Sequence, residues 1–398
     1  MIGKMKMSTA AVSEEEKVSC ETGETPQKEK DNPRRISSVR LLLALTALMV
    51  IFNIISWISP EAADFYALFI YSPIASVISA VMGIFPFSVG EIMIIIGLLL
   101  LAAAPVIFIA AGVGRKKRLA KIAGLFYAWV LAFILITETM NCFVLYHTTE
   151  FSEKFLCGGD GMYPVSEVIR LCELVIGEAN ELSGQVARDA DGKMTVPGNL
   201  GELAEISMNR LSGEYPQLAG IYPDPKRIMF SGFMTQLDLQ GIYFPFSLEA
   251  NYNGKLSPAR VPCTVMHELS HVKGFIREDE ACFIAYRACM VSDSPEVRYS
   301  GCLSAMNYLF AEINRNAPGE ASRLRGMIAP QVFSDNIFVD KEEKARIEEK
   351  AVIPTETVSA VSEKAMETTL KVNGVPDGKK SYNRMVRLLL DYYSEHEF

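Results

Sequence analysis

Two histidines and a glutamate in the second half of the chain have the residue types and the spacing of a metal site. The sequence H-E-L-S-H runs from His267 to His271, in a chain of 398 residues that has only four histidines. On a helix, residues four apart lie on one face, so both imidazoles can bind one ion while Glu268 lies beside them. Two neutral imidazoles and a carboxylate suit zinc, which leaves a fourth position for water and lowers the pKa of that water. The pattern predicts a zinc hydrolase with Glu268 as its general base.

The third protein ligand is expected in the acidic cluster that follows the second histidine. Gly274 allows the chain to turn back toward the metal, and Glu278, Asp279 and Glu280 come next. We favour Glu278 as the third ligand and keep Glu280 as the alternative. The same acids can instead cap a second helix, because negative charge is stabilised at a helix N-terminus.

Secondary structure around the motif is predicted from periodicity and from proline and glycine signals. The motif helix begins near Pro262 and ends at about Lys273, and short strands precede it. An edge strand at Gly241–Phe246 could pair with an extended peptide, although an ordinary structural strand is an equally good interpretation. The other predicted elements are a strand at Ile228–Phe233, a loop at Asp189–Leu200, and helices at Val165–Leu182, Glu278–Val291, Pro295–Asn314, Lys341–Lys350 and Ser381–Ser394.

The first third of the chain carries the apolar excess that is expected of a membrane protein. The chain is 49% hydrophobic with a mean hydropathy of +0.18, and the excess is concentrated between Leu41 and Val144. Three uncharged or nearly uncharged runs are long enough to cross a bilayer. These predicted spans are Leu41–Ile58, Ile92–Val113 and Ile122–Val144.

Basic residues set the expected topology of these spans. Arginines precede the first span, and the cluster Arg115–Arg118 follows the second, so both should face the cytoplasm. Three spans satisfy that rule, and we therefore interpret Phe65–Ile84 as an interfacial or re-entrant segment on the outer side. The prediction divides the chain into a disordered cytoplasmic tail (1–35), a transmembrane domain (36–146) and an extracytoplasmic domain (147–398).

Charge and cysteine usage narrow the function further. The net charge of −8 gives no basic surface for nucleic acid, so we predict no nucleic-acid partner. None of the eight cysteines has the C-x-x-C spacing of a zinc ribbon or a redox site. We expect mostly buried free thiols, with one disulfide outside the membrane as a remaining alternative.

The acidic cluster and several longer segments resemble known families. The run from Glu278 to Cys282 is similar to the E-x-x-A-D motif of membrane-bound gluzincin peptidases related to the CAAX prenyl protease, with cysteine in place of the aspartate. That resemblance implies that the first glutamate, Glu278, binds the metal. Over most of its length the chain also resembles a bacterial membrane family called domain of unknown function 3810. The shared segments are three N-terminal spans, G-I-x-x-P-F…E-A-N at 241–251, H-E-L-x-H…E-D-E-A at 267–281 and S-Y-x-R-x-V at 381–386.

The resemblance also suggests Tyr382 as the donor that stabilises an oxyanion, with Tyr299 as the alternative. Together these patterns predict an α-helical membrane segment followed by a mainly α, α+β, zincin-like metallopeptidase domain. The expected activity is zinc-dependent hydrolysis of peptide bonds outside the cytoplasm, at a bacterial cell membrane, with the lipid bilayer and a peptide or protein substrate as partners. A catalytically inactive zincin-like sensor or binding protein, and a zinc amidohydrolase acting on cell-wall peptides, are the alternatives. An intramembrane protease is excluded, because Pro262, Lys273 and Arg277 flank the motif.

Overall fold

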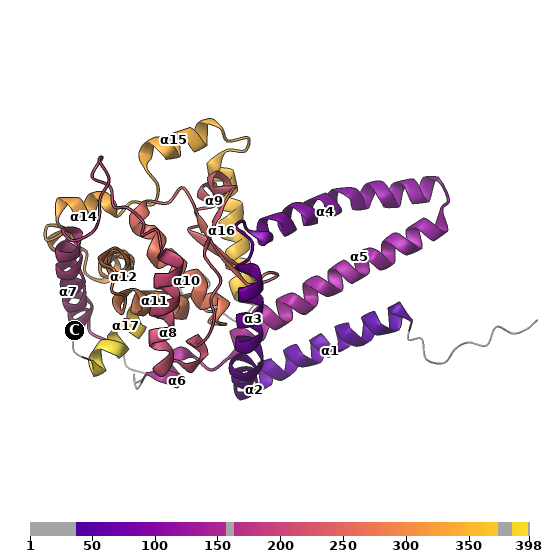
Figure 1. Cartoon of the computed structure of the whole chain (residues 1–398), viewed down its shortest axis with the longest axis horizontal. Coiled ribbons are helices and arrows are strands. Elements are labelled where there is room, and N and C mark those ends of the chain that lie inside the picture. The colour runs from indigo at the N-terminus through magenta and orange to yellow at the C-terminus, as the bar shows by residue number, and fades with distance from the viewer. Residues whose placement is uncertain (1–36, 157–162, 373–383, 397–398) are drawn as a thin grey trace, which may run out of the picture.

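A computed structural model describes residues 37–156, 163–372 and 384–396 (Figure 1). The predicted disordered tail, 1–35, lies outside the described residues. The fold is mostly helical, with long apolar helices near the N-terminus, a globular part beyond them and one small mixed sheet. The helices of the globular part surround the sheet and the helix that carries the histidine motif, as Figure 1 shows.

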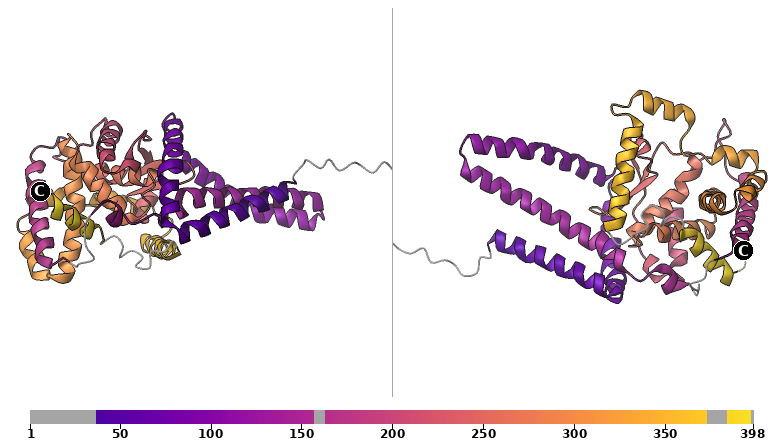
Figure 2. Two further views of the ribbon diagram at one scale, coloured as in Figure 1. Left: turned by 90° about the horizontal axis from the view of Figure 1, so that it is seen from below. Right: turned by 180° about the vertical axis from the view of Figure 1, so that it is seen from behind.

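Four helices are long and apolar enough to cross a membrane, by length and composition. Three of them extend side by side from the globular part in all three views (Figures 1 and 2). They are α1 (Ser38–Ile58), α4 (Val89–Val113) and α5 (Lys117–Glu138), and the last continues through η2 (Thr139–Phe143) to η3 (Leu145–His147). Each contains one of the three predicted spans.

The fourth apolar helix runs from Pro60 to Met82 as α2 (Pro60–Phe65), η1 (Tyr66–Tyr71) and α3 (Ser72–Met82). It lies across the ends of the other three, between them and the globular part (Figures 1 and 2). One face is buried through Ala67 and Ala75, whereas the opposite face exposes Phe69 and Val77. Such a helix packs one face against the protein, and its other face is suited to an apolar environment.

The globular part is built around α10 (Val261–Val272) and α11 (Glu278–Met290), which pack against each other and against α12 (Pro295–Asn316). Residues 279–289 of α11 are all buried, so this helix forms the centre of the core. The surrounding helices are α6 (Phe151–Phe155), α7 (Val165–Ser183), α8 (Leu200–Arg210), α13 (Pro318–Arg325), α14 (Pro330–Asp335), α15 (Lys341–Glu349), α16 (Thr355–Val372) and α17 (Arg384–Glu395), with short turns η4 (Leu211–Gly213), η5 (Pro216–Leu218) and η6 (Pro258–Arg260).

The sheet has the order β1-β3-β2, which places β2 (Gly241–Phe244) at an edge. Strand β1 (Lys226–Ile228) pairs in parallel with the central β3 (Glu249–Asn253), and β2 pairs with β3 in an antiparallel register that sets Phe244 opposite Glu249. The predicted edge strand is confirmed as a strand, although it ends at Phe244 rather than Phe246.

The strand predicted at Ile228–Phe233 is wrong beyond its first residue. The carboxylate of Glu91 accepts the backbone N–H groups of Met229 and Phe230 at 2.9 and 3.0 Å, which removes them from any sheet ladder. A short helix, α9 (Ser231–Gln236), follows directly. The β-branched and aromatic residues of this run therefore do not predict its backbone conformation, because hydrogen bonds to a carboxylate that is distant in the sequence determine it.

Most predicted helices are confirmed, and several described helices were not predicted, among them the short α6, α9, α13 and α14. Helix α7 matches Val165–Leu182, α15 is solvated as its charges suggested, and α12 extends two residues beyond Asn314. The predicted loop at Asp189–Leu200 is confirmed, but α8 follows it without having been predicted, and α16 was also missed. Residues 381–383 of the last predicted helix lie outside the described residues. The six cysteines in the described ranges are all free, so the disulfide alternative gains no support there.

A buried cluster of charges joins the membrane helices to the sheet. The carboxylate of Glu249 accepts the first backbone N–H groups of α4, from Val89 at 3.1 Å and Gly90 at 2.7 Å, and binds Lys226 at 2.6 Å. Lys226 also donates to the carbonyl of Met82 at the end of α3. Negative charge at a helix N-terminus is favourable, and here it satisfies amides that have no partner within the helix.

Removal of the Glu249 carboxylate should destabilise the whole protein. Both charged side chains are nearly inaccessible, at 0% exposed for Glu249 and 5% for Lys226, so Glu249→Ala leaves a buried ammonium unpaired. We expect a loss of about 3–5 kcal/mol in the free energy of unfolding, measured by denaturant unfolding in detergent. The matched control is Glu312→Ala, whose pair with Arg315 is exposed and should contribute below about 1 kcal/mol. Equal losses in both variants would contradict the interpretation.

Candidate metal centre

Helix α10 is positioned by its ends and by the core around it. Pro258 and Pro262 occupy the first turns of η6 and α10, where a missing N–H has no cost. Gly274 ends the helix with a φ of +89°, a backbone conformation that side chains with a Cβ rarely adopt. Every residue of α10 is buried except His267, whose side chain is 18% exposed. The motif helix therefore presents this imidazole to a pocket while the core fixes the rest.

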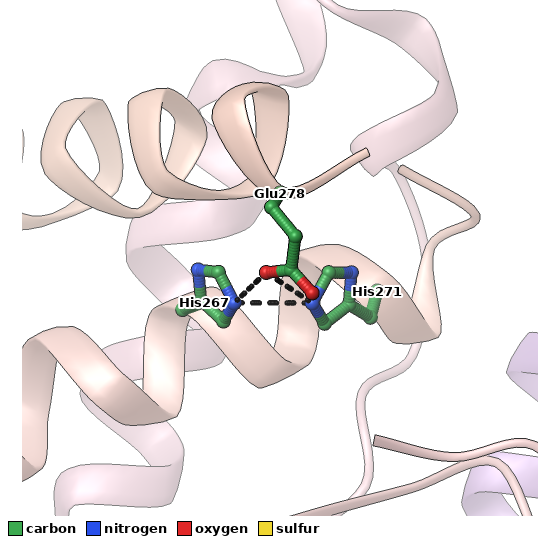
Figure 3. Close-up of side chains that lie close together, drawn as sticks. All are labelled: His267, His271 and Glu278. Carbon is green, nitrogen blue, oxygen red and sulfur yellow. Dashed lines mark hydrogen bonds and ion pairs between the residues drawn. The ribbon is translucent and has the colours of Figure 1, made fainter. Parts of the chain in front are cut away.

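His267, His271 and Glu278 bring three possible ligand atoms together, all within 4.8 Å of one another (Figure 3). The two Nε2 atoms are 3.0 Å apart, and Oε2 of Glu278 lies 3.1 Å from Nε2 of His267 and 3.7 Å from that of His271. Tetrahedral zinc with bonds near 2.05 Å holds its ligand atoms about 3.3 Å apart. The three side chains thus fit one zinc ion with little movement, and they come from α10 and the first turn of α11.

Each imidazole is oriented through its other nitrogen. Nδ1 of His271 lies 2.8 Å from the carbonyl of Phe275, which the turn at Gly274 brings back under the ring. An Nδ1–H that donates to this carbonyl leaves Nε2 as the free ligand atom. Nδ1 of His267 lies 3.5 Å from Sγ of Cys282, and that thiol is 3.0 Å from the hydroxyl of Tyr308. Cys282 therefore occupies the place of a partner that orients His267.

Attraction between opposite charges offsets the cost of burying the three side chains. Burial alone would raise the pKa of Glu278, but hydrogen bonds from His267 and His271 and the charges on both rings outweigh it and hold that pKa well below its usual range. Burial alone would lower the pKa of His271, yet the hydrogen bond and charge of Glu278 raise it to about 9. A cation that binds here replaces a proton in an anionic, preformed site.

Glu268 lies in the same pocket and is pressed against the edge strand. Its side chain is 5% exposed, and burial raises its pKa to about 6, close to that of a general base. The nearby backbone of Tyr243 in β2 offsets part of this rise in the pKa. A Cβ on Gly241 would lie 2.7 Å from Cγ of Glu268, so only glycine allows β2 to approach this closely.

The other two acids of the cluster point elsewhere. Oε1 of Glu280 accepts the backbone N–H of Phe151 at 2.9 Å, at the start of α6. Asp279 binds Arg384 at the start of α17, at 3.0 Å. The structure thus brings Glu278, and not the alternative Glu280, to the two histidines. Asp279 and Glu280 instead connect α11 to the starts of α17 and α6.

The two tyrosines predicted as oxyanion donors gain no support. Tyr382 lies outside the described residues. The hydroxyl of Tyr299 is buried and donates to Asp335 at 2.9 Å, away from the residues that line the pocket. Tyr308 does line the pocket, and sequence reasoning missed it because a lone tyrosine in the middle of α12 carries no signal of its own.

The pocket itself measures about 560 Å³ and is bounded by several elements. The ligand candidates form part of one wall, and β2 forms another through Gly241–Tyr243. Toward the long apolar helices, the pocket is lined by Cys142 of η2, Tyr146 of η3 and Met366 of α16. The site is therefore a cleft of ligand-binding size next to the membrane helices.

Substitution of the glutamates should separate the ligand from its neighbours. Glu278→Gln removes the anionic ligand atom, and we expect zinc occupancy of the purified full chain to fall at least tenfold in metal analysis. Glu280→Gln is the matched control, because this residue is two positions away and hydrogen-bonds Phe151. We expect it to keep its zinc. Loss of metal in the control and retention in the first variant would transfer the role to Glu280.

Comparison with known proteins identifies the family but no characterised relative. No curated protein and no solved structure matches the chain. The sequence model of one family, described as "Protein of unknown function (DUF3810)", matches residues 66–390. This range includes η1 and α3, the sheet, the three ligand candidates and more than half of α17. The chain belongs to the DUF3810 family.

Proposed function

We propose that this protein is a membrane-anchored, zinc-dependent metallopeptidase of zincin-like design that cleaves peptides outside the cytoplasm. The observation that carries the proposal is the convergence of His267, His271 and Glu278 on one point, with Glu268 beside them in the same pocket. A purely structural zinc site has four protein ligands, whereas this group has three and opens to a cleft. The ligand count, the adjacent carboxylate and the cleft together support catalysis rather than a closed structural site.

Zinc bound by these three side chains would supply Lewis acidity, which lowers the pKa of water and polarises a carbonyl. Glu268 is the residue of this chain that moves the proton. Its buried carboxylate, with a pKa raised to about 6, accepts a proton from the attacking water and then donates it to the leaving amine. The close approach of Gly241 in β2 limits the space that the carboxylate can occupy at the pocket wall.

Strand β2 supports a peptide as the substrate. It lies at the edge of the sheet, lines the pocket through Gly241–Tyr243, and reaches Glu268 through Gly241 and Tyr243. An extended peptide that adds to an exposed sheet edge gains backbone hydrogen bonds that do not depend on its sequence. Such binding would set the scissile bond next to the proposed base.

The test of catalysis is Glu268→Gln in the full chain. The amide cannot accept the proton, so we expect zinc to be retained while peptide hydrolysis falls by about 10²–10⁴-fold, measured on casein and on a peptide library. Glu173→Gln on the surface of α7 is the control and should change neither quantity. Equal hydrolysis by Glu268→Gln and the unmodified protein would refute the mechanism.

Two outcomes of this test would select the other candidate functions. Binding of peptides without hydrolysis by the unmodified protein would indicate an inactive sensor or binding protein. Hydrolysis confined to cell-wall peptides, with casein untouched, would indicate an amidohydrolase.

For the membrane, we propose three crossings by α1, α4 and the α5 region, with Pro60–Met82 lying along the outer surface. The N-terminal end of α1, near Arg40, and the turn with Arg115–Arg118 lie at the same end of the helices, far from the globular part (Figure 1). Basic clusters favour the cytoplasmic side, which leaves the globular part outside. The course of Pro60–Met82 across the other helices, with one apolar face exposed, supports an interfacial position.

Reporter fusions test this topology. Alkaline phosphatase, which is active only after export, should be active at the C-terminus and inactive when inserted after Lys116. Four crossings would reverse both results, because each additional crossing changes the side of everything that follows. The reversed pattern would overturn the three-span topology.

A further inference from the structure

A second chemical feature lies in the same pocket as the proposed metal centre, at the other end of the motif helix. Arg260 and Thr264 line the pocket together with His267 and His271. These positions repeat at helical spacing along one face of η6 and α10. At 1.5 Å per residue, the backbone of Arg260 is about 10 Å along the helix from that of His267.

The guanidinium of Arg260 has few partners and no counter-charge among the described residues. Its Nε donates to the carbonyl of Ile337 at 2.8 Å, and Nη2 donates to Oδ1 of Asn336 at 3.2 Å. No carboxylate in the described ranges forms an ion pair with it. A guanidinium carries five N–H donors in a planar fork, so most of its capacity to bind a carboxylate is unused.

Burial makes this lack of a counter-charge costly. The side chain is partly buried, and burial lowers the pKa of Arg260 below its ordinary value. Two other buried or partly buried arginines are paired with carboxylates, Arg188 with Asp335 and Arg287 with Glu214. The buried ammonium of Lys273 has no carboxylate partner, but neutral oxygens accept all three of its N–H groups. A partly desolvated cation without an anion is an unfavourable arrangement unless a ligand supplies the anion.

The neighbouring side chains are polar but mainly neutral. Asn307 and Asn336 exchange two amide hydrogen bonds of 3.0 and 2.9 Å, which fixes the oxygen that holds Arg260. Among the described pocket-lining residues, Arg260 is the only lysine or arginine. Asp238 also lines the pocket, but it is exposed and its carboxylate accepts the hydroxyl of Ser359. The end of the pocket at Arg260 therefore has the chemistry of an anion subsite.

We propose that Arg260 binds a carboxylate of the peptide substrate, about three residues from the bond that is cleaved. An extended chain advances about 3.3 Å per residue, so three residues span the distance of about 10 Å between the two ends of the pocket. The carboxylate is either the C-terminus of the peptide or an acidic side chain. This inference rests on the proposed function, because it names the substrate class of the same site.

Binding to a variant that cannot turn over tests the subsite apart from catalysis. The zinc-loaded full chain carrying Glu268→Gln is presented with three matched pools of N-acetylated hexapeptides. One pool is neutral with an amidated C-terminus, one is neutral with a free C-terminus, and one is amidated with a single glutamate at varied positions. We expect one of the two acidic pools to bind about ten- to a hundredfold more tightly than the neutral pool. The identity of that pool distinguishes the two sources of the carboxylate.

The same measurement on Arg260 variants decides the assignment. Adding Arg260→Gln should abolish the preference for the acidic pool while zinc content and binding of the neutral pool stay within twofold. Arg260→Lys keeps a charge but loses the fork, and should retain part of the preference. It also serves as the deciding variant if Arg260→Gln fails to fold. Arg227→Gln, at an exposed arginine of β1, is the control and should bind like the parent.

Two results would overturn the proposal. The first is a parent protein that binds all three pools equally, and the second is a preference that survives loss of the charge at Arg260. Failure of the proposed function gives a different signature, namely equal hydrolysis with and without the carboxylate of Glu268.

Discussion

The short connection between α10 and α11 is the constraint on which the candidate metal centre depends. Only six residues, 272–277, separate His271 from Glu278, and in that length the chain must end one helix, reverse and begin another. The positive φ of Gly274 makes the reversal, and the carbonyl of Phe275 then orients His271. Because the same turn places Glu278 opposite the two imidazoles, ligand orientation and ligand assembly are parts of one local structure.

The ligand candidates could be predicted from sequence because their geometry is local. Residues four apart on a helix share a face, and a glycine followed by an acidic helix start limits where the next carboxylate can lie. For the same reason, the structure has Glu278, and not Glu280, beside the two histidines. Tyr308 and Arg260 gain their significance only from contacts with distant elements, so no pattern in the chain distinguished them from ordinary core or surface residues. Cys282 was noticed only as a departure from a motif, and its contacts with His267 and Tyr308 required the structure.

The sheet shows the opposite case, in which distant contacts override local preference. Strand β3 reads as polar, E-A-N-Y-N, yet it is central, because Glu249 is neutralised by Lys226 and the start of α4. The run after Ile228 looks like a strand but leaves the sheet, because Glu91 takes its N–H groups. The apolar helices were predictable from length and composition, and charge bias had already distinguished Phe65–Ile84 from the three predicted spans. The structure adds the direction of this segment, as Pro60–Met82, across the ends of the other three helices.

The hydroxyl of Tyr71 connects the apolar N-terminal helices to the globular part. It donates to the carbonyl of Val272 at 3.0 Å and lies 3.0 Å from the hydroxyl of Tyr243. Both partners are made after it, by 201 and 172 residues along the chain. During synthesis the apolar helices therefore leave the ribosome before their partner surfaces exist, and these contacts form only once the later half of the chain has been made. A fragment that begins after His147 would lack this hydroxyl and the apolar helices that carry it, so the buried carbonyl of Val272 would lose its partner.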